Sequence, residues 1–296
     1  MRPTPFDDPA YGPALAHLGE PWLAAGWPGP LVRRAIPGTI HHDLIGVWPY
    51  ASAPVGSDAA HAAFAAFRAS GAVTFQALAR PDEPVDAAAL SAAGFAVRPF
   101  KTHYVLRPDR PAPAPGAKTR ANLARARRTW RVAERPLADH LAAVCAWHEA
   151  LARRRQMSAQ ASLPAAHFAR LAALPAFTAL FAEDDAGPAA CLLVAAMDDR
   201  IHFHAIAGDE RAYRERAFYA LYREAVARWG ADRTIYFGGA PGGPAGPGIA
   251  RFKARFANDQ TPVHLVTAVL DPAACDALAA TRGTPGWFPP YRGPQG

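Results

Sequence analysis

The sequence of 296 residues contains very little lysine and cysteine. Lysine and arginine together number 32, and only Lys101, Lys118 and Lys253 are lysines. The three cysteines lie far apart, so they provide neither a disulfide framework nor a Cys-x-x-Cys metal pattern. No apolar run is long enough to cross a bilayer, and the N-terminus lacks the basic and then apolar order of a secretion signal. These absences predict a reduced, cytoplasmic protein with no metal site and no membrane span.

The rest of the composition is that of a folded protein with an excess of positive charge. Apolar residues make up 51% of the chain and charged residues 19%, a balance typical of globular proteins. The formal net charge of +7 favours anionic partners such as phosphates, nucleotides or nucleic acid. A general preference for arginine over lysine explains the same charge without any partner. The positions of the basic residues must therefore distinguish between these two explanations.

A proline-rich segment at 107–118 divides the chain, because its prolines lack the N–H groups that a continuous helix or central strand needs. We therefore expect an N-terminal half at residues 1–110 and a C-terminal half at residues 116–296. In the first half, β-branched and aromatic runs predict strands, and alanine-rich segments of helical period predict helices. The strands are expected at 41–50, 72–79 and 95–108, and the helices at 57–70 and 84–94.

The second half shows a more regular order of elements. After a helix at 117–130, the patterns predict the order β-α-α-β-β-β-α-β-α-β. The strands are expected at 131–136, 177–184, 189–198, 200–208, 233–239 and 262–270, and the helices at 137–155, 163–174, 210–229 and 248–257. This order resembles that of the GNAT acyltransferase fold, and the first half resembles a degenerate second copy. Two such halves in tandem resemble the Fem-type peptidyltransferase (FemABX) family. The resemblance implies an α+β fold of tandem GNAT-like halves, each a mixed, mostly antiparallel sheet flanked by helices.

The segment before the helix at 210–229 lacks a glycine-rich loop. In GNAT enzymes that use acetyl-CoA, such a loop lets backbone N–H groups close around the pyrophosphate at a helix N-terminus. Here the stretch has no glycine, and the bulky Tyr213, Arg214 and Arg216 occupy it. Fem-type proteins instead take an aminoacyl group from tRNA. The resemblance therefore implies an aminoacyl-tRNA donor and no bound cofactor, with Arg211, Tyr213 and Arg214 beside the substrate or its phosphate.

The segment "YFGGAPGGPAGPGIARFKARF" resembles the strand, glycine-rich turn and F-K-x-x-F helix of Fem-type sequences. The helical period places Phe252 and Phe256 on one face, so that Lys253 points beside them across a strand edge. An ammonium there would balance a phosphate or a developing oxyanion. Lys253 is thus a candidate catalytic residue, and the alternative is a solvated lysine on a surface helix. The candidate phosphate contacts nearby are Gly238, Gly239 and Arg251.

The strand at 200–208 alternates so that His202 and His204 share one face. A histidine on the open side of such a strand would accept a proton from an attacking amine near neutral pH. His204 is therefore the candidate base, and a structural histidine is the alternative. No activated cysteine or serine arrangement is visible, which favours direct attack without a covalent enzyme intermediate.

The helix at 117–130 is strongly basic, and its "R-x-N-L-x-x-A-x-R" pattern resembles a segment of Fem-like sequences. A basic stripe of this kind suits an RNA backbone, and the alternative is an exposed helix made basic by arginine preference. The candidate tRNA contacts are Lys118, Arg120, Arg125, Arg127, Arg128 and Arg131. The segments "DLIG" (43–46) and "KTHY" (101–104) resemble parts of uncharacterised GNAT-like bacterial proteins.

These resemblances imply a Fem-related transferase that moves an aminoacyl group from aminoacyl-tRNA onto an amine of a small-molecule or metabolite acceptor. The sequence lacks the long heptad hairpin that Fem-type cell-wall enzymes carry, which disfavours cell-wall bridge synthesis. Two alternatives stay open. One is a GNAT N-acyltransferase that uses acyl-CoA or a carrier-bound acyl thioester, and the other is a catalytically silent binding module with the same fold.

Overall fold

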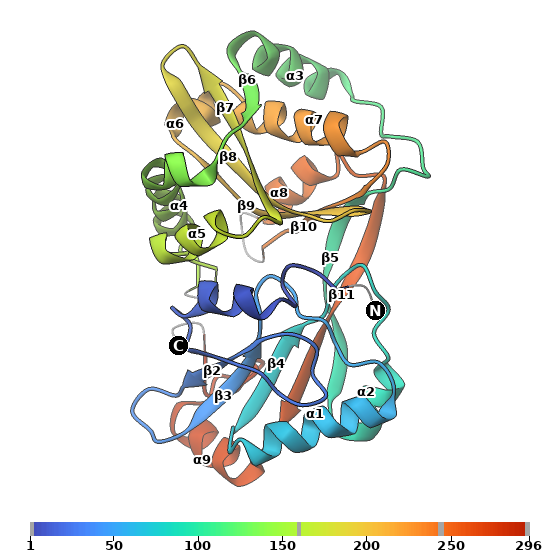
Figure 1. Ribbon diagram of the computed structural model, residues 1–296, viewed down its shortest axis with the longest axis vertical. Helices are drawn as coiled ribbons and strands as arrows, with labels where there is room; N and C mark the ends of the chain where they lie inside the picture. Colours follow the sequence, from blue (N-terminus) through green and yellow to red (C-terminus); the bar gives the residue numbers. More distant parts are fainter. Residues whose placement is uncertain (1–2, 159–160, 242–245, 294–296) are drawn as a thin grey trace. The chain divides into compact units, whose positions relative to one another are not determined.

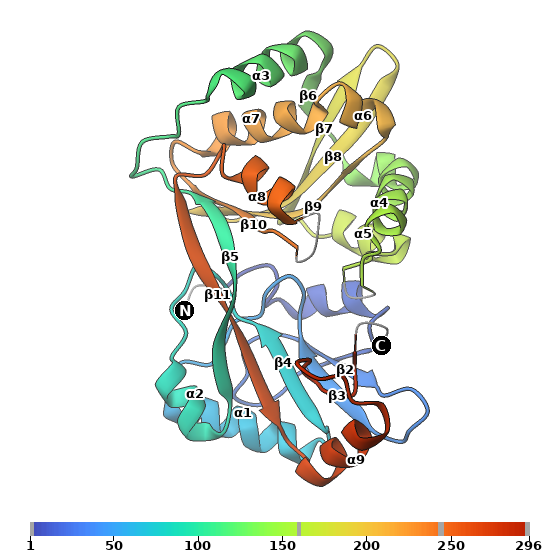
Figure 2. The same cartoon turned by 180° about the vertical axis from the view of Figure 1, so that it is seen from behind.

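The computed structural model describes residues 3–158, 161–241 and 246–293. Its contacts divide the chain into two compact units, each a mixed sheet with helices packed on it (Figures 1 and 2). We call Met1–Phe100 with Val263–Gly296 the terminal unit, and Lys101–Pro262 the central unit. The glycine-rich turn expected after residue 238 lies partly outside the described residues.

The sheet of the terminal unit has the strand order β1-β2-β3-β4-β11. Neighbouring strands are antiparallel except for the parallel pair β3 and β4. The side chains of Trp27, Phe67, Phe75 and Phe95 form an aromatic core, with ring centroids 4.6–6.3 Å apart. The elements are η1 (Pro9–Leu15), β1 (Glu20–Trp22), β2 (Leu31–Ala35), β3 (His42–Gly46), α1 (Ser57–Ala69), β4 (Thr74–Leu78), α2 (Ala87–Ala93), β11 (Asp259–Val269) and α9 (Pro272–Arg282).

The sheet of the central unit has the strand order β5-β10-β9-β8-β7-β6. Its neighbours are antiparallel except for the parallel pair β9 and β10. The strands are β5 (Ala96–Leu106), β6 (Arg131–Glu134), β7 (Phe177–Asp184), β8 (Gly187–Ala196), β9 (Arg200–Gly208) and β10 (Thr234–Gly239). The helices are α3 (Ala117–Thr129), η2 (Leu137–His140), α4 (Leu141–Arg155), α5 (Ala165–Ala172), α6 (Glu210–Arg214), α7 (Ala217–Trp229) and α8 (Gly246–Lys253).

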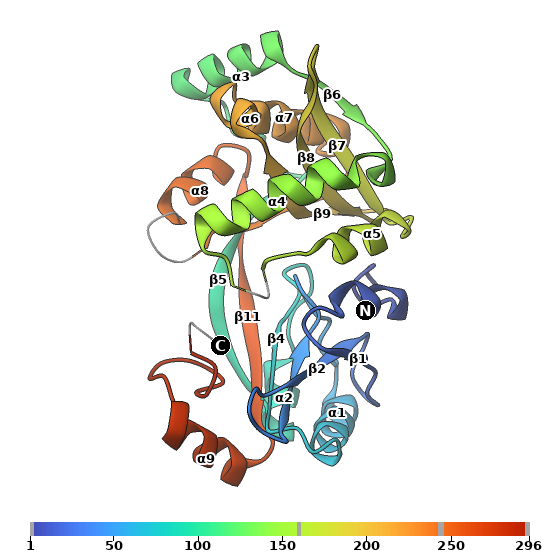
Figure 3. The same cartoon turned by 90° about the vertical axis from the view of Figure 1, so that its left-hand side faces the viewer.

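Helices cover both faces of the central unit's sheet. On one face, Tyr222 of α7 packs between Phe203 and Phe237 of the sheet and Phe252 and Phe256 at the end of α8. On the other face, α4 crosses the sheet at β8 and β9, with α5 beside it (Figure 3). The sheet is therefore apolar on both sides, which explains why most residues of β8 and β9 are buried.

In each unit, the strand beyond the parallel pair comes from the other half of the sequence. β4 pairs with β11, which follows α8, and β10 pairs with β5, which follows α2. The unit boundaries consequently lie within β5 and close to the start of β11. Residues 263–296, which the sequence assigned to the second half, belong to the same unit as residues 1–100. The difference arises because strand exchange is set by long-range pairing, which no local pattern records.

The fold class expected from the sequence, an α+β chain of two halves with mixed and mostly antiparallel sheets, is confirmed. One long helix was expected at 210–229, but it is divided into α6 and α7. Arg216 between them has a left-handed φ of 65°, and the carbonyl of Glu215 accepts a hydrogen bond from the indole Nε1 of Trp130 at 2.8 Å. A tertiary contact thus stabilises a helix break at a place where the sequence has neither glycine nor proline to predict it.

Candidate active site around Lys253

The parallel strands β9 and β10 pair over only part of their described length. Their register joins Thr234 to Arg200, Ile235 to Ile201 and Tyr236 to His202. Beyond that point β9 continues along β8, while β10 continues along β5. The register of β10 shifts between Tyr236 and Gly238, and Gly238 has a φ of 77°, which glycine adopts without strain. The two strands therefore diverge beyond Tyr236 and His202.

Lys253 lies beside this divergence. Its Nζ donates a hydrogen bond of 2.6 Å to the carbonyl oxygen of Gly239, and its side chain is half-buried. The end of α8 is held in place by Phe252, whose ring lies 5.0 Å from Tyr219 and 4.8 Å from Tyr222. Lys253 is thus a positioned side chain and differs from a freely solvated lysine.

A second lysine reaches the same glycine from β5. Gly239 pairs with His103, and a Cβ atom added to Gly239 would lie 3.0 Å from Cδ2 of His103 and 3.1 Å from Cδ of Lys101. On the neighbouring strand, the ring of His202 stacks on that of Tyr236, with centroids 4.6 Å apart and planes 7° apart. We call this group the Lys253 cluster. Its members are Lys101, His103, His202, Tyr236, Gly239 and Lys253.

The Lys253 cluster is electropositive and partly dehydrated. Burial, and then the charge of Lys101, lowers the pKa of Lys253 to about 7. Burial also lowers the pKa of Lys101. The pKa of His103 falls to about 2, first through burial and then through the charges of Lys101, Lys253 and His202. At neutral pH His103 is therefore uncharged, whereas Lys253 exchanges its proton readily.

His204, the base expected from the sequence, lies in a different group of side chains. The register of β8 and β9 shifts between Leu193 and Val194, so His204 occupies a bulge. Its Nε2 lies 3.0 Å from Nε2 of His167 on α5, a hydrogen bond in which one imidazole donates to the other. Burial, followed by the charges of His167 and His148, lowers the pKa of His204 well below its usual value. An imidazole so strongly biased to its neutral form is a weak proton acceptor at neutral pH.

The residues expected to contact the substrate before α7 make contacts within the protein. Arg211 forms an ion pair of 2.7 Å with Asp184, and its guanidinium carbon lies 5.6 Å from the ring centroid of Trp130. Tyr213 lies under the guanidinium of Arg154 at 4.1 Å. Arg214 contacts Glu215 at 3.3 Å. Of the other two expected contacts, Gly238 is buried in the bulge of β10, and Arg251 is exposed on α8.

The basic side chains of α3 divide into two groups. Arg125 forms an ion pair of 2.9 Å with Glu215, and Arg120 donates to the carbonyl of Pro115 at 2.7 Å. Arg131, just after α3, lies 3.5 Å from Asp185. Lys118, Arg127 and Arg128 of α3 are exposed, as are Arg120 and Arg125. Exposed ion pairs contribute little to stability, so an anionic partner can compete with Glu215 for Arg125.

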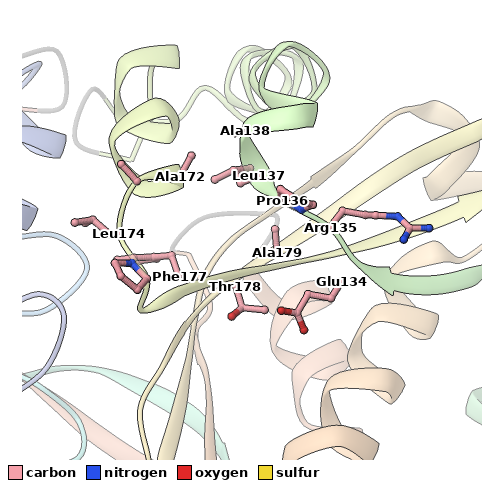
Figure 4. Close-up of a pocket in the computed structure, with 12 residues that line it drawn as sticks. Glu134, Arg135, Pro136, Leu137, Ala138, Ala172, Leu174, Phe177, Thr178 and Ala179 are labelled. Carbon is pink, nitrogen blue, oxygen red and sulfur yellow. The ribbon is translucent and has the colours of Figure 1, made fainter.

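A pocket of about 510 Å³ lies elsewhere in the central unit, where β6 and η2 meet the end of α5 and the start of β7 (Figure 4). Most of its lining is apolar, and it contains no candidate site residue. The lining is formed by Glu134, Arg135, Pro136, Leu137, Ala138, Ala172, Ala173, Leu174, Pro175, Phe177, Thr178 and Ala179. The ring of Phe177 also contacts His204, with centroids 5.4 Å apart. The pocket therefore borders the buried histidines and is separate from the Lys253 cluster.

Two further findings concern the described part of the chain alone. Within it, no group of three or more His, Cys, Asp or Glu side chains is arranged to hold a metal ion. None of its helices combines the length and the apolar character that a bilayer span needs.

Sequence reasoning singled out Lys253 but missed its neighbours Lys101 and His103. Two signals pointed to them. Lys101 is one of only three lysines in the chain, and both residues belong to the segment "KTHY". They were missed because β5 was assigned to the first half of the chain, whereas it pairs with β10 in the central unit.

Solved structures of known proteins share this arrangement. FemX matches with a TM-score of 0.65 over 90% of this chain and 92% of its own, at 11% sequence identity. The C-terminal domain of a putative lysylphosphatidylglycerol synthetase from Agrobacterium fabrum matches with a TM-score of 0.60 over 95% of this chain and 91% of its own, at 14% identity. L-PGS from Bacillus licheniformis matches with a TM-score of 0.56 over 92% of each chain, also at 14% identity. No protein-family model matches the sequence, and neither does any curated protein. The chain therefore has the fold of FemX and of these two further structures.

Proposed function

We propose that this protein is a Fem-related aminoacyltransferase that moves an aminoacyl group from aminoacyl-tRNA onto the amine of a small-molecule acceptor, with Lys253 as its catalytic residue. One observation carries the proposal. In a Fem-type fold, a half-buried lysine is fixed on the carbonyl of Gly239 where β9 and β10 diverge, at 2.6 Å. Burial and a neighbouring cation keep its pKa at about 7.

The reaction would be a direct transfer. The amine nitrogen attacks the carbonyl carbon of the aminoacyl ester, a C–N bond forms, and the carbonyl oxygen becomes an oxyanion. The ester C–O bond then breaks, the tRNA hydroxyl leaves with a proton, and the amine loses one. The ammonium form of Lys253 would stabilise the oxyanion and supply the proton to the leaving oxygen. Because its pKa lies near neutrality, the neutral form left behind can accept the proton of the amine.

The cysteines support a mechanism without a covalent enzyme intermediate. Burial raises the pKa of the Cys191 thiol on β8, and it also raises the pKa of Cys145 on α4 and of Cys275 on α9. A raised pKa leaves little thiolate at neutral pH, and the thiolate is the nucleophile. None of the three belongs to the Lys253 cluster.

The choice of donor rests on the segment that precedes α7. In place of a glycine-rich loop, the chain has the short helix α6, capped by Asp209, and then the left-handed Arg216. The backbone N–H groups of Ala212 and Tyr213 donate to Asp209, and that of Glu215 donates to the carbonyl of Arg211, so these donors are already used within the protein. One protein of similar fold is named as a putative lysylphosphatidylglycerol synthetase, and lysylphosphatidylglycerol is an aminoacylated product. Both points favour an aminoacyl donor over coenzyme A.

The test is a single-turnover assay with tRNA charged with labelled amino acids and a panel of amine acceptors. We expect the wild-type protein to form a labelled amide with at least one pair. Lys253→Ala should lose on the order of a hundredfold in rate, equivalent to roughly 3 kcal/mol of barrier. Lys253→Arg should recover little, because a wider guanidinium misplaces the charge and holds its proton.

Arg170→Ala serves as the control, because it removes an exposed cation from α5 in the same unit. It should transfer at the wild-type rate. A Lys253→Ala protein that is folded and as fast as wild type contradicts the proposed role of Lys253. Transfer from acyl-CoA, with no transfer from any charged tRNA, replaces the proposed donor with the thioester.

A further inference from the structure

We infer that Lys101 and Lys253 together form a two-lysine site for one oxyanion of the substrate, and that the pair takes up a proton when the anion binds. The anion is a phosphate or a carboxylate, which share the charged oxygens that two ammonium groups recognise. The inference deepens the proposed function by adding Lys101 as a second substrate-binding cation. The inference depends on the proposed function for one point, which is that the anion belongs to the substrate.

The geometry places both lysines around a single residue. Lys253 reaches Gly239 from α8 and donates to its carbonyl oxygen at 2.6 Å. Lys101 reaches Gly239 from β5, with its Cδ 3.1 Å from the position that a Cβ of Gly239 would occupy. A side chain at residue 239 would therefore press into Lys101 and His103, so glycine keeps this space for the lysine stem. The Lys253 ammonium uses one of its three N–H donors on Gly239, and the others can serve an anion.

The titratable and charged groups described around the two lysines come from several elements. From β5 comes His103, from β9 His202, and from β10 Tyr236 stacked on His202. On α8 itself, Arg251 is exposed, and Arg255 beyond the helix donates to the hydroxyl of Tyr219 at 3.1 Å. The effects that act on the Lys253 pKa are burial and the charge of Lys101, and both favour the neutral amine. An oxyanion between the lysines offsets both effects, because its negative charge favours the ammonium form of each lysine.

The coupling follows from the same charges. Before the anion binds, burial and then the charge of Lys101 keep Lys253 partly deprotonated at pH 7.5. After it binds, the ammonium form is favoured at both lysines. A lysine whose pKa rises from about 7 to well above 8 takes up more than about half a proton at that pH. An arginine pair would bind the anion without this uptake because a guanidinium is always charged. The inference thus gives a physical reason for two of the three lysines in a chain that mostly uses arginine.

The experiment is isothermal titration calorimetry of the full chain at pH 7.5 with sulfate in one arm and acetate in the other. Both anions are fully ionised at this pH, so any proton taken up goes to the protein. Each titration is run in two buffers of very different ionisation enthalpy, Pipes and Tris, and the difference in heat gives the number of protons. We expect millimolar binding of one anion with uptake of about half a proton or more. Preference for sulfate identifies a phosphate as the natural group, and preference for acetate identifies a carboxylate.

Lys101→Met and Lys253→Met should each weaken binding by about tenfold or more and abolish the uptake. Arg170→Met, which removes an exposed cation from α5, should bind as wild type does. Circular dichroism checks that each variant is folded. If a methionine variant is unfolded, Lys253→Arg replaces it, and it should bind the anion with less proton uptake than wild type, because a guanidinium stays charged.

The inference is overturned if the wild-type protein binds neither anion, if it binds without proton uptake, or if folded Lys101→Met binds as tightly as wild type. None of these measurements uses tRNA. Binding with proton uptake in a protein that shows no aminoacyl transfer would therefore remove the proposed function and leave the two-lysine site. Transfer that depends on Lys253 but is unchanged in Lys101→Met would instead remove the two-lysine site and leave the proposed function.

Discussion

Lys253 combines two properties that an arginine cannot supply together. Its side chain is fixed by a backbone acceptor, the carbonyl of Gly239, and its pKa of about 7 lets it gain and lose a proton at neutral pH. A guanidinium keeps its proton throughout the physiological range and needs a wider site. In a chain where arginine replaces lysine almost everywhere, the meeting of Lys101 and Lys253 at one glycine indicates a chemical requirement for amines.

The lowered pKa of Lys253 predicts a pH-dependent stability difference between wild type and Lys253→Met. The folded pKa of about 7 lies below the ordinary value of 10.5, so between these two pH values the unfolded chain binds more protons. Wild-type stability therefore rises with pH in that window, and the full cost of burying the ammonium applies below about pH 7. Lys253→Met should be the more stable protein at pH 6, by on the order of 1 kcal/mol after allowance for its partial exposure. The advantage should shrink toward pH 10.

Urea denaturation of both proteins at pH 6, 8 and 10 measures this difference. Other titrating groups are common to both proteins, so they cancel when the two free energies of unfolding are subtracted at each pH. A difference that stays constant over the range would mean that Lys253 keeps an ordinary pKa in the folded protein. The electrostatic reason for expecting proton uptake at the two-lysine site would then be removed.

At the scale of elements, the Lys253 cluster depends on the bulge in β10. Between Tyr236 and Gly238 the pairing of β10 with β5 shifts register, and Gly238 has a φ of 77°. This left-handed residue comes directly before Gly239, whose carbonyl receives the Lys253 hydrogen bond. Any side chain at 238 makes that conformation costly, by about 1–2 kcal/mol. The conformation of Gly238 thus fixes the Gly239 carbonyl, which is the hydrogen-bond acceptor of Lys253.

We therefore expect Gly238→Ala to lower the free energy of unfolding by about 1–2 kcal/mol and to reduce aminoacyl transfer as well. Gly71→Ala is the matched control. Gly71 also has a positive φ, 75°, and a Cβ there would meet no atom within 4 Å, so it tests strain away from the Lys253 cluster. Its stability should fall by a similar amount while its transfer rate stays at the wild-type value. Equal transfer rates in the two folded variants would mean that the bulge does not position Lys253.

The elements of the central unit follow closely from local patterns, but the composition of its site does not. The F-K-x-x-F segment predicted a helix end with Lys253 beside Phe252 and Phe256, and these rings pack as the period requires. Lys101 was missed because it lies on β5, which local sequence joins to the first half of the chain. The surroundings of His204 could not be predicted for a related reason. A bulge and the imidazole of His167 determine its surroundings, and neither is encoded in the alternation of β9.

At the scale of the whole molecule, the net charge of +7 is distributed unevenly between paired and exposed arginines. Around α3, Arg125 is paired with Glu215, whereas Arg127 and Arg128 of the last helical turn are exposed. An RNA backbone would therefore meet Arg127 and Arg128 without displacing a protein carboxylate. At Arg125 it would have to compete with Glu215. The structure thus ranks residues that the sequence alone had treated as equivalent.

The last prediction concerns the binding of charged tRNA. Its affinity should fall steeply as salt rises, because each phosphate contact releases condensed counterions. Replacing Arg127 and Arg128 together with glutamine should weaken binding and reduce the slope of log K against log salt by about 2. Adding Arg125→Gln should change the slope by less than either of the others does.

Filter binding over a series of salt concentrations measures these slopes, with Arg68→Gln/Arg98→Gln as a control that removes two exposed arginines of the terminal unit. A control variant that loses as much affinity as the α3 variant would show that general charge, and no surface on α3, attracts the RNA. Micromolar binding of coenzyme A without binding of charged tRNA would favour the acyl-thioester alternative.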